Sequence, residues 1–143
     1  LGKSGRVIPS YLDYAQHVAK ESMFNTPPVF AVYASLLTLQ WLENNGGIAA
    51  AEERNIAKAK LLYDEIDRNP LFECFCVPED RSLMNVSFKI TDESKKEAFD
   101  NAWKAAGING LNGHRSLGGY RASLYNALPI ESVQVLVDVM KSI

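Results

Sequence analysis

Hydrophobic and polar positions in the first half of the chain repeat with the period of an α-helix. Between residues 29 and 44 apolar side chains share one face and further apolar positions widen it, which predicts a largely buried helix. Thr26 can cap this helix, the two prolines after it fit the first turn, and Asn45 with the two following glycines ends it. The apolar face consists of Phe30, Tyr33, Leu37 and Trp41.

A second helix is predicted over residues 48–69, with an apolar face and a charged face that we expect to be solvated. The apolar positions are Ile56, Ala59, Leu62, Tyr63 and Ile66. The charged positions are Glu52, Glu53, Lys58, Lys60, Asp64, Glu65 and Arg68. The stretch before the first helix, residues 1–20, carries glycine and proline breakers and is predicted to be irregular.

After Pro70 the apolar residues alternate with polar ones, which is typical of β-strands. Residues 71–77 and 83–90 are predicted to form a hairpin, and residues 120–125 a further strand, with a short strand or turn at 108–113. Helices are predicted after Asp92, up to Gly107, and over the last residues of the chain. This order predicts an α+β fold, a small mainly antiparallel sheet with helices packed on one side.

Composition narrows the classes of function. The 143 residues carry a net charge of −2 and no basic block, which disfavours nucleic-acid binding. The apolar runs are too short and too interrupted for a membrane span, so we expect a cytoplasmic protein. Cys74 and Cys76 are expected to be ordinary buried thiols, because their spacing suits neither a disulfide nor a zinc site. No nucleophile with an adjacent base is evident, and His17 is expected at the surface.

Two groups of residues could bind anions. In "GHRSLGGYRASLYN", residues 113–126, His114 and Arg115 precede a Gly-Gly turn and Arg121 follows it on a predicted strand. Two arginine forks can grip one anionic group bidentately, although a solvated loop explains the same residues. In "FNTPP", Asn25 and Thr26 lie at a helix start, where they serve either as a plain cap or as a phosphate site.

Several motifs together resemble the C-terminal portion of the phosphoserine aminotransferase family, class-V pyridoxal-phosphate enzymes of the aspartate aminotransferase fold type. They are "SMFNTPP", "NNGG", "MNVSF" and "GHRSLGGYRASLYNALP", in matching order over essentially the whole chain. The resemblance implies transfer of an amino group from glutamate to 3-phosphohydroxypyruvate, in a homodimeric enzyme of serine biosynthesis.

The resemblance also assigns roles to residues. It implies that Arg121 holds the substrate α-carboxylate and that His114 and Arg115 lie by the distal phosphate. It implies that Asn25 and Thr26 contact the pyridoxal 5'-phosphate of the neighbouring subunit.

The Schiff-base lysine of the family lies upstream of all four motifs, and the surroundings of Lys3 do not match it. We therefore expect residues 1–22 to be a connecting tail, residues 23–143 to be the C-terminal small domain, and the isolated chain to be inactive, without a catalytic residue or a covalently bound cofactor. Two alternatives stay open: a non-enzymatic module that binds small anionic metabolites, and a dimerisation domain in which Arg115 and Arg121 form ion pairs.

Overall fold

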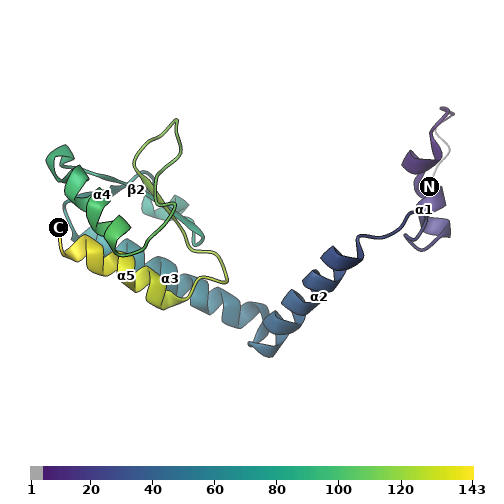
Figure 1. The fold of residues 1–143 in the computed structure, drawn as a ribbon, viewed down its shortest axis with the longest axis horizontal. Helices are drawn as coiled ribbons and strands as arrows, with labels where there is room; N and C mark the ends of the chain where they lie inside the picture. Colours follow the sequence, from purple (N-terminus) through teal and green to yellow (C-terminus); the bar gives the residue numbers. More distant parts are fainter. Residues whose placement is uncertain (1–4) are drawn as a thin grey trace. The chain divides into compact units, whose positions relative to one another are not determined.

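The computed structural model describes residues 5–143, so Lys3 lies outside the described residues. The chain divides into two compact units, residues 1–44 and residues 45–143 (Figure 1). Among the described residues, all three strands lie in the second unit.

The N-terminal unit contains more helix than its sequence predicts. A 3-10 turn, η1 (Ser10–Leu12), is followed by a short helix, α1 (Tyr14–Ala19). The side chain of Asp13 accepts a hydrogen bond from the backbone N–H of Ala15 at 3.0 Å and so caps α1. The prediction of an irregular segment is therefore wrong over these residues, because it did not take into account the cap that Asp13 provides.

The helix α2 (Val29–Asn44) forms where the apolar pattern predicts it, but none of its residues is buried by the described part of the chain. Phe30 is 84% exposed and Trp41 49%, so the prediction of a buried helix is wrong for the described residues. The helix begins at Val29, three positions beyond Thr26, so Thr26 is not its N-cap. An apolar pattern predicts that one face of a helix is buried, but it does not identify the segment or subunit that covers this face.

The C-terminal unit is built on α3 (Gly47–Arg68) and a three-stranded antiparallel sheet in the order β1-β2-β3. The strands are β1 (Phe72–Cys74), β2 (Asn85–Ile90) and β3 (Tyr120–Ser123), with a 3-10 turn, η2 (Pro78–Asp80), between the first two. A second 3-10 turn, η3 (Glu93–Lys95), leads into α4 (Lys96–Ala105), and α5 (Ile130–Lys141) ends the unit. The predicted hairpin and α+β fold are confirmed, whereas residues 108–113 supply only an isolated bridge, from Asn112 to Tyr120.

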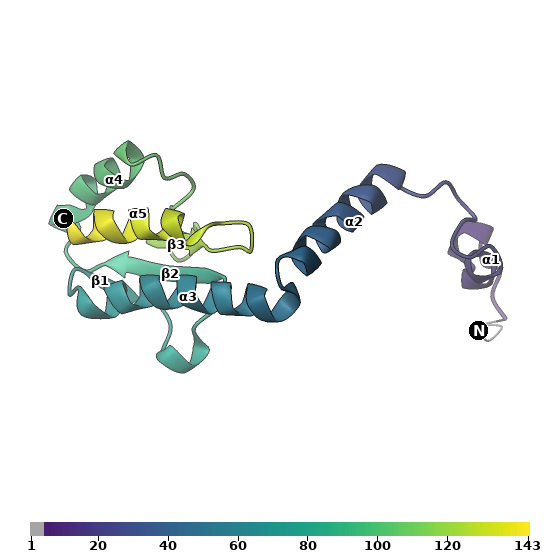
Figure 2. The same cartoon turned by 90° about the horizontal axis from the view of Figure 1, so that it is seen from below.

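One apolar core joins the sheet to its helices. Along β2 buried and half-buried residues alternate, and the buried ones pack against α3, α4 and α5. α3 and α5 lie side by side along the sheet (Figure 2). The buried positions predicted for the last helix are all confirmed: Val133, Leu136, Val137 and Met140.

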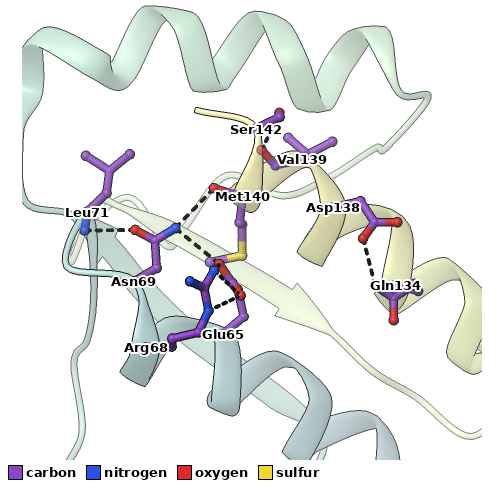
Figure 3. A network of polar contacts seen from close by, with 9 residues as sticks. All are labelled: Glu65, Arg68, Asn69, Leu71, Gln134, Asp138, Val139, Met140 and Ser142. Carbon is purple, nitrogen blue, oxygen red and sulfur yellow. Dashed lines mark hydrogen bonds and ion pairs between the residues drawn. The ribbon is translucent and has the colours of Figure 1, made fainter.

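Polar contacts join the C-terminal ends of α3 and α5 (Figure 3). Glu65 is 3% exposed and accepts hydrogen bonds from Arg68 at 2.7 Å and from the Asn69 amide at 3.1 Å. The same amide donates to the carbonyl oxygen of Met140 on α5 at 3.1 Å. Glu65 was expected on a solvated face, and its burial corrects that expectation, because a carboxylate with several donors tolerates burial.

Candidate functional site

The loop that carries His114 and Arg115 is closed by a backbone hydrogen bond between two glycines. The N–H of Gly113 donates to the carbonyl of Gly119 at 2.9 Å, and Gly118 and Gly119 have φ angles of +75° and +60°. A Cβ on Gly119 would lie 2.6 Å from the carbonyl oxygen of Phe88, so any side chain there would collide with β2. The loop therefore presents its polar side chains on a tightly defined turn.

His114 and Arg115 are both exposed on this loop. The Nδ1 of His114 lies 2.7 Å from the hydroxyl of Ser116, a contact that restrains the ring. Among the described residues Arg115 has no hydrogen-bond or salt-bridge partner, so its guanidinium is available to a ligand.

Arg121 projects from β3 on the exposed side of the strand, as the alternation predicts. Its backbone N–H donates to the carbonyl of Leu111 at 2.7 Å, while its guanidinium forms no salt bridge with any of residues 5–143. Arg121 also lines a cavity of about 320 Å³ together with Ser123 and apolar residues of α5. Neither His114 nor Arg115 lines this cavity, so the structure of this chain alone does not bring the three candidates into one pocket.

Tyr120, the neighbour of Arg121, anchors the strand from its other face. Its ring stacks on Phe88 with centroids 5.4 Å apart, and its hydroxyl donates to Asp100 at 2.8 Å. Burial and the carboxylate of Asp100 raise the pKa of Tyr120. Burial by itself would raise the pKa of Asp100, but hydrogen bonds from Lys96, Tyr120 and Trp103 outweigh it and hold that pKa below its ordinary value.

Asn25 and Thr26 line a groove of about 690 Å³ in the N-terminal unit, which His17 and Tyr33 also line. Both side chains are exposed, and no hydrogen bond occupies them among the described residues. The turn before them carries two consecutive non-glycine residues with left-handed φ, +48° at Glu21 and +66° at Ser22. Such strain often accompanies functional segments.

His17 lies only partly at the surface, since it is half-buried. Its Nε2 is 2.8 Å from the carbonyl oxygen of Tyr11, and its ring meets Phe24 edge-on at 5.4 Å. Cys74 and Cys76 are free and half-buried, and burial raises the pKa of Cys74. Residues 5–143 contain no cluster of three metal-ligating side chains, and no helix within them is long and apolar enough to cross a membrane.

The structure buries two polar residues of α3 next to β3: Asn55, which the sequence analysis did not name, and Lys58, which was wrongly expected on the solvated face. Lys58 is 2% exposed and Asn55 is 7% exposed, and both bond to the turn at residues 124–128. Burial, with a smaller effect of the Arg54 charge, lowers the pKa of Lys58. Helical spacing could have revealed them, because positions 55, 58, 62 and 66 follow one face of a helix and the last two are apolar.

Comparison with known proteins gives consistent results. The profile of the family Aminotransferase class-V matches residues 2–136. The chain is 68% identical over 143 residues to a phosphoserine aminotransferase of Flavobacterium johnsoniae and 54% identical to one of Parabacteroides distasonis, covering 40% of the length of each. It thus spans about two fifths of these relatives, which are longer proteins.

The solved structures that this chain resembles are also phosphoserine aminotransferases. A phosphoserine aminotransferase from Bacillus circulans subsp. alkalophilus has a TM-score of 0.84 at 39% identity, over 94% of this chain and 38% of that one. A pyridoxal-phosphate-bound phosphoserine aminotransferase from Trichomonas vaginalis has a TM-score of 0.79 at 41% identity, over 94% of this chain and 39% of that one. The fold of the chain is therefore that of a part of such enzymes.

Proposed function

The chain belongs to the class-V aminotransferase family, and from this membership we propose that it is the C-terminal part of a phosphoserine aminotransferase. The names of its relatives support this assignment, as does the share of their length that it covers. In this proposal residues 1–22 connect to a preceding large domain and residues 23–143 form the small domain. We also propose that the full-length protein is a homodimer in the cytoplasm.

The proposed reaction moves an amino group from glutamate to 3-phosphohydroxypyruvate and yields 2-oxoglutarate and O-phosphoserine. Both amino acids carry an α-carboxylate, and they differ at the distal end, where one carries a carboxylate and the other a phosphate. A site for both needs one fixed cation at the common end and a second group of donors at the distal end.

The observation that carries the proposal is the position of Arg121. Its guanidinium is exposed and has no salt bridge with the described residues, although it stands on a strand that is anchored from the opposite face. A planar fork held in this way suits bidentate binding of a carboxylate. Arg121 therefore binds the α-carboxylate, and His114 with Arg115 binds the distal phosphate.

The side chains of Asn25 and Thr26 fit the phosphate of pyridoxal phosphate, because an amide and a hydroxyl without other partners among the described residues line an open groove. The cofactor, when bound, supplies the carbonyl chemistry that carries the amino group between the substrates. Asn25 and Thr26 contribute donors to its phosphate from a neighbouring subunit.

Amino transfer by the full-length parent protein tests the proposal. We expect it to convert glutamate and 3-phosphohydroxypyruvate to 2-oxoglutarate and O-phosphoserine. We also expect a strong preference over pyruvate, which lacks the phosphate. A parent that transfers no amino group, or that accepts pyruvate equally well, would contradict the proposed function.

A further inference from the structure

Lys58 is a buried cation that bonds only to backbone carbonyls of the described residues. Its Nζ donates to the carbonyl oxygens of Leu124 at 3.0 Å, Tyr125 at 2.8 Å and Leu128 at 3.1 Å. An ammonium group has three donors, so these three bonds use all of them. No carboxylate of residues 5–143 forms a salt bridge with it. The carbonyl oxygens of one turn, residues 124–128, therefore stabilise its positive charge.

Asn55, one helical turn before Lys58, holds the same turn from a second point. Its amide nitrogen donates to the side-chain oxygen of Asn126 at 2.8 Å. The turn begins directly after β3, where the N–H of Leu124 donates to the carbonyl of Met84 at 2.8 Å. Helix α3 therefore clamps the C-terminal end of β3 with two polar side chains, both of them buried.

β3 is a short edge strand that pairs with β2 over residues 120–123, and side chains from other elements also hold both of its ends. At the N-terminal end, Tyr120 stacks on Phe88 and bonds to Asp100. At the C-terminal end, Lys58 bonds to the carbonyl of Leu124. Arg121 lies between these anchors, one residue from the first and three from the second.

We propose that Lys58 is a positioning residue for Arg121: by fixing the turn at residues 124–128 it holds the C-terminal end of β3 in place, which aims the guanidinium at the substrate α-carboxylate. This inference rests on the proposed function of Arg121. Lys58 itself contacts no substrate. A charged donor is suited to the task, because hydrogen bonds from an ammonium are stronger than those from a neutral group.

A double-mutant cycle in the full-length holoenzyme tests the coupling between the two side chains. Lys58→Met keeps most of the length and bulk of the side chain but removes all three donors. We expect it to raise the KM for glutamate and for O-phosphoserine about tenfold, with kcat changed less than about twofold, because a misaimed clamp weakens binding. In an Arg121→Ala background the same substitution should change KM by less than about twofold, since the guanidinium that binds the α-carboxylate is already gone.

Lys60→Met is the matched control, because Lys60 lies on the same helix but pairs with Asp64 at the surface. It should leave both KM values and the cofactor content unchanged. If Lys58→Met yields no soluble enzyme, Asn55→Ala removes only the side-chain bond to Asn126, and a smaller rise in KM that vanishes in the Arg121→Ala background supports the same conclusion.

Other outcomes overturn the inference. A KM that stays at the wild-type value while the melting temperature falls would make Lys58 a stabilising residue only. Equal effects of Lys58→Met with and without Arg121 would show that the two are uncoupled. If Arg121→Ala itself has wild-type kinetics, the proposed function of Arg121 fails first, so the two failures are distinguishable.

Discussion

Tyr120 and Arg121 are neighbours on β3 that face opposite sides of the sheet, the tyrosine ring packed in the core and the guanidinium outside it. The buried side chain of Tyr120 holds the strand in place, and the exposed side chain of Arg121 gives its outer face a positive charge. A cation on a rigid element loses little conformational freedom when it binds an anion, which favours affinity. Substitutions at this pair and around it therefore test the proposed binding of anions.

Arg121→Ala in the full-length enzyme should impair glutamate and O-phosphoserine alike, because the α-carboxylate is common to both. A hydrogen bond to a charged group contributes roughly 1.5–3 kcal/mol, which corresponds to about a ten- to hundredfold loss in kcat/KM. Arg121→Lys should restore little, since an ammonium lacks the planar two-point grip. Half-reaction rates with each amino acid measure the effect, and wild-type rates in Arg121→Ala would contradict the assigned role.

Arg115→Ala should discriminate between the substrates. The distal phosphate carries a charge of about −2 and the distal carboxylate of glutamate −1, so the loss should be larger for O-phosphoserine. The two half-reactions, measured at one fixed salt concentration, give the comparison. Equal losses for both amino acids would contradict the proposal that Arg115 binds the distal group.

Thr26→Ala should accelerate dissociation of pyridoxal phosphate from the parent enzyme without a matching loss of stability. Thr26 is not the N-cap of α2, so the substitution should change the unfolding free energy by less than about 0.5 kcal/mol. Thr26→Ser keeps the hydroxyl and serves as the control. A melting temperature that falls while cofactor dissociation stays at the wild-type rate would assign Thr26 a structural role instead.

Asp100→Asn should destabilise the parent enzyme by about 1–2 kcal/mol at neutral pH, because it removes the charge from an acceptor of three side-chain donors. The pKa of Asp100 lies below its ordinary value, so the stability that the carboxylate adds is present above that ordinary value and is lost as pH falls through the folded-state pKa. Wild type and variant should therefore converge in acid. Melting temperatures between pH 7 and pH 3 measure this, and a gap that widens in acid would refute the sign.

The isolated 143-residue chain should neither transaminate nor carry covalently bound pyridoxal phosphate. The resemblance places the Schiff-base lysine upstream of the four family motifs, and Lys58 is occupied by three carbonyls. Borohydride reduction after incubation with the cofactor, followed by mass spectrometry, detects any adduct. Stoichiometric labelling of one lysine would contradict the expectation.

Local periodicity was sufficient for most of the C-terminal unit. The alternation around Val86 and Phe88 placed one face of β2 in the core, and the spacing of Val133, Leu136 and Val137 gave the inward face of α5. The same alternation turned Arg121 outward. These features follow from geometry within a single element, in which neighbouring positions determine which side chains share a face.

Only the tertiary structure decided what lies opposite each face. Lys58 and Glu65 have charged side chains that the pattern assigns to solvent, yet both are buried. Lys58 bonds to carbonyls of a turn that is remote in sequence, whereas Glu65 accepts hydrogen bonds from the nearby Asn69, which also bonds to Met140 of α5. Conversely, Phe30 and Trp41 share an apolar face that the described residues leave exposed. A sequence specifies the chemistry of a surface through its own residues, whereas burial and hydrogen-bond partners depend on segments that are remote along the chain and become neighbours only on folding.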